Sequence, residues 1–153
     1  STVSNSYSTG DVSGDVVVGG LVGHNYVSSI SNCYSTRDVS GGWDVGGLVG
    51  DNDDGNVSSC FWDIENQTHG ITESIGENYG IVTNVSYLKT AQMQTQSTFT
   101  EAGWDFVDIW LINEGATYPV LRQEIRSNLN GDDGVDLLDF ALFADHWLEG
   151  KDE

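Results

Sequence analysis

A 27-residue repeat restricts the fold of this chain more than any other feature of its sequence. Residues 3–23 (VSNSYSTGDVSGDVVVGGLVG) recur as residues 30–50 (ISNCYSTRDVSGGWDVGGLVG). A third copy begins with VSSCF at residues 57–61, and the similarity ends soon after. The offset is the same at every match and no insertion breaks it, so Tyr7, Tyr34 and Phe61 are equivalent. A fixed period of this length marks repeated units that bury their apolar faces only by stacking on each other.

Each period has the composition of short strands joined by turns. Runs of Val, Tyr, Thr and Ser are bounded by Gly, Asn and Asp, and the first period predicts strands over 3–7, 11–13 and 16–22. The pair Gly19-Gly20 suits a sharp corner, either because a side chain would collide there or because φ must be positive. We therefore predict a mainly β fold, a parallel β-solenoid in which equivalent residues stack about 4.8 Å apart.

The repeat resembles a known family. The sequence GGLVG with C-Y-S-T-x-x-V-S is similar to the GLUG-motif repeat of bacterial surface and secreted adhesin-like proteins, over residues 1–64. The resemblance implies a non-enzymatic structural or adhesive role outside the cell, in a secreted or cell-surface protein. The chain starts directly in repeat sequence without a signal peptide, as a mature or truncated product would.

The acidic composition narrows the range of partners. The chain has 24 acidic and five basic residues, a formal charge of −19, which argues against nucleic acid because phosphate contacts need Lys and Arg. The acid either serves solubility alone or binds divalent cations that relieve its self-repulsion. The cluster of Asp51, Asp53 and Asp54 is accordingly either a turn or a surface calcium site. The sequence contains no run of 18 apolar residues, so we predict no membrane-spanning helix.

The sequence permits two kinds of covalent modification. Cys33 and Cys60 fall on the same rung, where stacked Cα atoms about 4.8 Å apart lie within disulfide range. In-register Cβ atoms lie slightly farther apart than a disulfide prefers, so a disulfide and a reduced pair both stay open. Asn56, Asn66 and Asn84 are N-x-S/T glycosylation acceptors.

Residues 65–122 break the period and are predicted to form an irregular capping segment. We expect loops and short strands in residues 65–86, and a short helix in residues 88–99 with Thr90 as its candidate cap.

Residues 101–122 are the most apolar part of the chain. With the preceding M-x-x-x-S-T-F, their G-W-D-F and Y-P-V-L motifs resemble the closing segment that often follows GLUG repeats. An open coil end exposes unpaired backbone groups and core side chains, so we expect this segment to cover that end. Trp104 and Trp110 are expected to pack inside it, with sugar stacking as the alternative.

Residues 123–153 carry the pattern of a calcium-binding loop followed by a helix. Calcium takes six to eight oxygen ligands, and a twelve-residue loop supplies them from positions 1, 3, 5, 7, 9 and 12. In this chain those positions are Asn128, Asn130, Asp132, the Gly134 carbonyl, Asp136 and Asp139. Position 6, normally Gly, is Asp133, a residue type that tolerates the left-handed conformation. Shifting the register by one residue places Leu129 at the first position, so the alternative register fails.

The loop and its helix resemble one half of a dockerin repeat. The family pattern is D-x-N-x-D-G-x-x-D-x-x-D followed by F-x-x-F/L-x-x-x-W, and here Asn128 replaces Asp and Asp133 replaces Gly. Dockerins have two such repeats and this chain has one, which weakens the case for cohesin-type docking.

No catalytic signature is present in the sequence. The nucleophile-elbow, H-E-x-x-H, P-loop and dinucleotide motifs are all absent. Asp63 and Glu65 form an acidic pair of the kind that sugar-cleaving enzymes use, but such pairs arise by chance among 24 acids. We therefore predict no enzymatic activity.

Two non-enzymatic hypotheses follow from these patterns, and the third alternative is a polysaccharide-active enzyme, which would need a long acid-lined groove. In the first, the chain is a structural or adhesive module that stacks head to tail into a fibre, because its first coil begins at a strand with no polar cap. In the second, it is a binding module that recruits a partner through the dockerin-like unit or binds glycans through Tyr26 and Trp43. A glycan array and a pull-down would separate the second hypothesis from the first.

We expect calcium to bind the loop at residues 128–139 and to stabilise the chain. Calorimetry should record heat on calcium addition, and the melting temperature should rise with calcium relative to chelator. A chain that shows neither heat nor a thermal shift has no calcium site in this loop.

Overall fold

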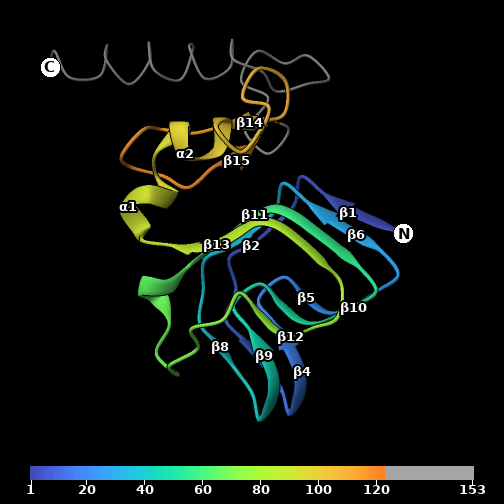
Figure 1. Cartoon of the computed structure of the whole chain (residues 1–153). Helices are drawn as coiled ribbons and strands as arrows, with labels where there is room; N and C mark the ends of the chain where they lie inside the picture. The colour runs from blue at the N-terminus through green and yellow to red at the C-terminus, as the bar shows by residue number, and fades with distance from the viewer. Residues whose placement is uncertain (123–153) are drawn as a thin grey trace, which may run out of the picture.

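The structure is a computed structural model that describes residues 1–122. Its body is a parallel β-solenoid of about three turns, with a smaller segment of two short helices and a strand pair beside it (Figure 1). The predicted mainly β fold is therefore confirmed. In the described residues no helix is long and apolar enough to cross a membrane.

Five short strands make up each of the first two coils. The first coil contains β1 (Thr2–Ser4), β2 (Tyr7–Ser8), β3 (Val12–Ser13), β4 (Val16–Gly19) and β5 (Val22–Tyr26). The second contains β6 (Ser29–Ser31), β7 (Tyr34–Ser35), β8 (Val39–Ser40), β9 (Trp43–Gly46) and β10 (Val49–Asp53). The chain then continues through β11 (Asn56–Asp63), the 3-10 turn η1 (Ile64–Asn66), β12 (Ile75–Asn78) and β13 (Ile81–Leu88).

Equivalent residues of successive repeats lie directly above one another, as the period predicts. Strands β2 and β7 pair in parallel with Tyr7 opposite Tyr34, and β7 pairs with β11 with Tyr34 opposite Phe61. The rings of Tyr7 and Tyr34 are stacked with their centroids 5.0 Å apart. Like residues are thus held one strand spacing apart by backbone hydrogen bonds.

The third coil is more complete than the sequence analysis expected. Strand β12 pairs with β10 with Val49 opposite Ile75, and β13 pairs with β11 with Val57 opposite Val82. The loops and short strands expected in residues 65–86 are present, but these strands also continue the stack past residue 64 to Leu88. The missed signal is a V/I-G-x-N pattern, present as VGHN, VGDN and IGEN, that one-residue deletions shift out of the 27-residue period.

The paired glycines serve close packing and not positive φ. A Cβ on Gly19 would lie 2.0 Å from the Val22 carbonyl oxygen, and one on Gly47 would lie 2.1 Å from the Trp62 indole. Neither glycine has a positive φ. Left-handed backbone occurs instead at other positions, including Asn5, Asn32 and Ser59, which repeat at the same corner of successive coils. Of the two reasons offered for Gly19-Gly20, collision is the correct one.

An asparagine ladder runs through the solenoid at the end of β5, β10 and β12. The Asn25 Nδ2 donates to the Asn52 Oδ1 at 2.7 Å, and the Asn52 Nδ2 donates to the Asn78 Oδ1 at 2.7 Å. Asn25 and Asn52 are buried, so each amide satisfies the next across one strand spacing. Beside the ladder lies an apolar core that includes Ile30, Leu48 and Val57.

Residues 89–122, the aromatic segment, fold against the solenoid. They contain α1 (Thr90–Met93), α2 (Gln96–Thr100) and the antiparallel pair of β14 (Trp110–Leu111) with β15 (Val120–Leu121). Two short helices replace the single predicted one. Thr90 is the first helical residue and not the cap, because Lys89 occupies the N-cap.

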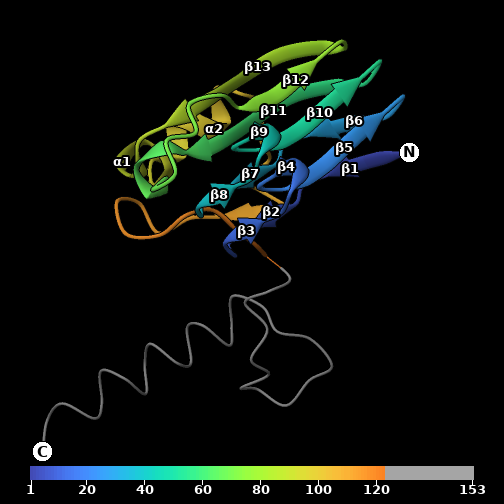
Figure 2. The ribbon, with the colours of Figure 1, turned by 90° about the horizontal axis from the view of Figure 1, so that it is seen from below.

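The aromatic segment covers a flank of the solenoid and not its open end, so that expectation was wrong. Ring centroids are 6.2 Å apart for Trp110 and Tyr7, 6.3 Å for Trp104 and Tyr34, and 6.1 Å for Trp104 and Phe61. The segment thus contacts a column that runs through all three coils, and both views place it beside this face (Figures 1 and 2). Trp104 and Trp110 are buried, as expected, which removes them as sugar-stacking platforms.

Because Gly47 lies against the Trp62 indole, adding one methyl group at residue 47 should strongly lower the stability of the fold. Gly47→Ala should lower the free energy of unfolding by about 2 kcal/mol, because its Cβ overlaps the buried indole. Gly10→Ala is the matched control, since a Cβ there meets nothing within 4 Å. Urea denaturation of both variants measures the difference, and equal stability of the two would contradict this packing.

Candidate functional site

The two ends of the strand stack form the candidate functional site. One column of equivalent side chains has exposed fractions of 37% at Val3, 1% at Ile30, 0% at Val57 and 41% at Val82. The same position is therefore core inside the stack and surface at its ends. Each end exposes apolar side chains that one further strand would cover.

The end strands also have a free backbone edge within the described residues. Strand β1 pairs only with β6, and β13 pairs only with β11. Figure 2 shows them at opposite ends of the stack, with the N-terminus beside β1. We call residues 2–8 the lower edge and residues 81–88 the upper edge.

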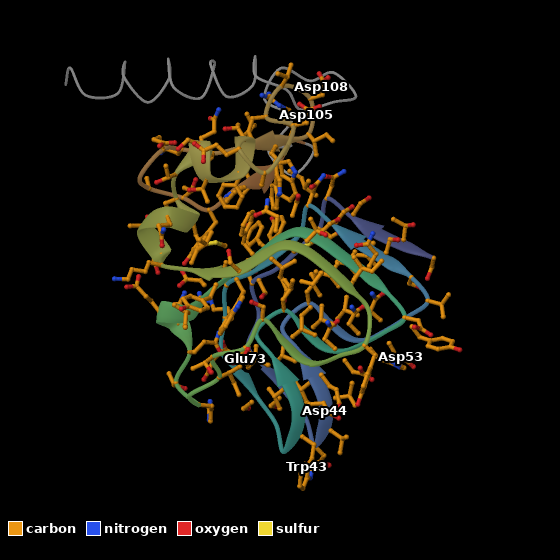
Figure 3. The ribbon with its side chains drawn as sticks, in the orientation of Figure 1. Trp43, Asp44, Asp53, Glu73, Asp105 and Asp108 are labelled. Atoms are coloured by element: carbon orange, nitrogen blue, oxygen red, sulfur yellow. The ribbon has the colours of Figure 1, made fainter. Side chains whose placement is uncertain are left out.

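Neither edge carries an acidic or basic side chain, although the chain has a formal charge of −19. The acidic side chains labelled in Figure 3 lie elsewhere: Asp44 beside Trp43, Asp53 at the end of β10, Glu73 in the loop before β12, and Asp105 and Asp108 on the aromatic segment. The edges are thus places where another strand can approach without facing a like charge directly.

A column of charged side chains runs along β5, β10 and β12. His24, Asp51 and Glu77 are in register, and the His24 Nε2 lies 3.4 Å from the Asp51 Oδ2. Desolvation, followed by repulsion and hydrogen bonding from Glu77, raises the pKa of Asp44. Within residues 1–122, no group of three or more His, Cys, Asp or Glu side chains is arranged to hold a metal ion. Asp51, Asp53 and Asp54 therefore do not form such a group in the described residues.

The predicted calcium ligands lie outside the described residues. This applies to Asn128, Asn130, Asp132, Gly134, Asp136 and Asp139. The calcium loop stays a prediction.

Cys33 and Cys60 occupy equivalent positions in adjacent coils of the solenoid. Both are free thiols with 0% exposure, and each Sγ donates to the carbonyl oxygen two residues earlier, at Ser31 and Ser58. Hydrogen bonding to the Cys33 sulfur and burial raise the pKa of Cys60.

The three glycosylation acceptors differ in accessibility. Asn56 and Asn84 are exposed. The Asn66 Nδ2 instead donates to the Thr36 carbonyl at 2.8 Å and to the Tyr118 hydroxyl at 3.2 Å, so its amide is used within the fold.

The two aromatic residues considered for glycan binding lie on different sheets. Tyr26 ends β5 and is 62% exposed, whereas Trp43 begins β9 and is 73% exposed. Figure 3 places Trp43 at the tip where β4 and β9 project from the body.

Asp63 and Glu65 hold the junction between the solenoid and the aromatic segment. The buried Asp63 carboxylate accepts hydrogen bonds from the Thr90 and Tyr118 hydroxyls, both at 2.7 Å, and from the Glu65 amide at 2.9 Å. The Glu65 carboxylate accepts from the Thr90 amide at 2.9 Å. Burial and the adjacent Asp63 carboxylate raise the pKa of Tyr118. Both acids therefore have structural hydrogen-bond partners.

Comparison with known proteins places the repeat in one described class. Residues 14–40 match the GLUG motif, which supports a GLUG repeat protein. Curated proteins and solved structures contain no significant match to the chain.

The hydrogen bonds between the solenoid and the aromatic segment predict that Asp63 contributes more to stability than Glu65 does. Asp63→Ala should lower the free energy of unfolding by about 3 kcal/mol, because it leaves the Thr90 and Tyr118 hydroxyls without their charged acceptor. Glu65→Ala, at an exposed position, should cost less than about 1 kcal/mol. Thermal denaturation of both variants distinguishes them, and a larger loss for Glu65→Ala would contradict the assignment.

Proposed function

We propose that this chain is a non-enzymatic structural or adhesive module of the cell exterior, which acts by stacking head to tail with further copies. The observation that carries the proposal is the column from Val3 to Val82, buried in the interior coils and about two-fifths exposed at each end. Stacking converts both exposed positions into interior ones. It also pairs the free backbone groups of β1 and β13.

The GLUG motif and the solenoid support the structural part of the proposal. A stack of coils is a one-dimensional scaffold in which each unit contacts only its neighbours, so it extends without a change of fold. The aromatic segment packs against Tyr34 and Phe61 on the flank of the solenoid and, within residues 1–122, leaves Val3 and Val82 exposed.

Charge sets the conditions for assembly. Copies with a formal charge of −19 repel each other, and this repulsion is screened at an ionic strength of about 0.15 M or above. Calcium bound at the loop of residues 128–139 would lower the negative charge further and stabilise the module. We propose calcium as its cofactor on the pattern of that loop, and a second copy or a cell-surface glycan as its partner.

If copies stack head to tail, the average mass of the oligomers should rise with protein concentration and with salt concentration. In sedimentation velocity, the full chain should form a ladder of oligomers at about 0.5 M salt and fewer at about 0.02 M, because screening removes the repulsion. Electron microscopy of the same samples should show unbranched rods. A single monomer peak at high concentration, with salt and calcium present, would rule out self-stacking.

A further inference from the structure

We infer that two copies join through one parallel strand pair, the upper edge of one copy against the lower edge of the next, with Val82 opposite Val3. The inference rests on the proposed head-to-tail function and specifies its contact. It follows from three features of the described residues: the direction of the free backbone groups, the column of equivalent side chains, and a one-strand step in the stack.

Backbone groups of the lower edge face outward at Thr2 and Ser4. The Ser29 amide donates to the Ser1 carbonyl, and the Asn5 amide donates to the Ser31 carbonyl, so the odd-numbered residues of β1 face β6. Successive residues of a parallel strand direct their amide and carbonyl to opposite sides. The Thr2 carbonyl and the Ser4 amide are therefore directed away from the solenoid.

The upper edge presents the complementary groups at Val82. The Ile81 amide donates to the Gly55 carbonyl, so residue 81 faces β11 and the amide and carbonyl of Val82 face outward. With Val82 opposite Val3 of a second copy, the Val82 amide reaches the Thr2 carbonyl and the Ser4 amide reaches the Val82 carbonyl. A slip of one residue would place inward-facing groups in the seam and lose both bonds.

The side chains select the same register. The pairs Val3–Ile30, Ile30–Val57 and Val57–Val82 are all in register, so a second copy continues the column of β-branched residues with its own Val3. The upper edge lacks the usual protections of an edge strand. It is eight residues long and contains no proline and no charge, and Ile81 is 65% exposed.

The stack has one more strand on the β13 face than on the β12 face. A second copy can therefore pair its backbone with the first copy only on the β13 face. Four strands, β1, β6, β11 and β13, lie in one column, whereas β5, β10 and β12 make three. A second copy seated on β13 therefore leaves its β5 about two strand spacings, roughly 10 Å, above β12. Glu77 and the His24 of the next copy stay out of contact, so these two residues take no part in the joint.

Edge-blocking prolines test the joint. Ser4→Pro and Val82→Pro each remove an outward-facing amide and place a ring in the seam without removing an intrachain hydrogen bond. Each variant alone should assemble at least ~10-fold less tightly than the parent, by sedimentation velocity at about 0.5 M salt. An equimolar mixture should form dimers only, because one intact edge of each variant remains. Ser4→Ala and Val82→Ile keep the amide, and Val82→Ile also keeps an apolar β-branched side chain in the column, so both should assemble like the parent.

The other outcomes separate this inference from the proposed function. If the parent chain does not assemble, the proposed function itself fails. A second outcome is that the parent chain assembles, that Glu77→Gln or His24→Ala weakens this assembly, and that Ser4→Pro and Val82→Pro do not. The contact then lies between β12 and β5, and the inference is wrong. If Val82→Pro blocks assembly, Ser4→Pro still forms dimers by itself, and the mixture gives no dimer between the two variants, the strands pair as β13 with β13 and the head-to-tail register is overturned. Circular dichroism checks that each variant is folded, and Ser4→Pro alters only an exposed three-residue strand.

Discussion

The stacking of one coil on the next, at a single strand spacing, is the constraint on which the rest of this structure depends. Coils this close leave no space for a Cβ at Gly19 or Gly47, and they bring Asn25, Asn52 and Asn78 near enough for each amide to bond the next. The same spacing superimposes equivalent residues, so the core column of Val3, Ile30, Val57 and Val82 is apolar in every coil. The interior is therefore a set of columns, and its stability comes from repeated contacts between neighbouring coils.

The aromatic segment adds a second core without ending the stack. Its rings contact Tyr7, Tyr34 and Phe61, so it ties three coils together from one flank, and Asp63 fixes its entry through two hydroxyl groups. A segment that sealed an end would have removed a free edge. This segment instead stiffens the solenoid and leaves both edges available, an arrangement suited to a unit that is extended along one axis.

Sequence reasoning succeeded where the period was intact and failed where it was interrupted. The columns through Tyr34 and the burial of Trp104 and Trp110 followed from the repeat and from the clustering of apolar residues. The strands β12 and β13 were missed because two one-residue deletions shift them out of the period, although β12 keeps the pattern I-G-E-N. A solenoid tolerates such deletions in its corners, because only the strand register has to be preserved.

The sequence by itself determined the parallel stack and its register over the first two coils and the start of the third. These properties are local or periodic, so they can be read from the spacing of residues along the chain. Only the tertiary structure decided that the aromatic segment lies on a flank, that Asp63 joins it to the solenoid, and that the stack ends in a one-strand step. The physical reason is that an apolar segment is equally well buried against a flank or an end, and hydrophobic burial has no direction of its own. The choice rests on shape and on specific hydrogen bonds between residues far apart in the chain.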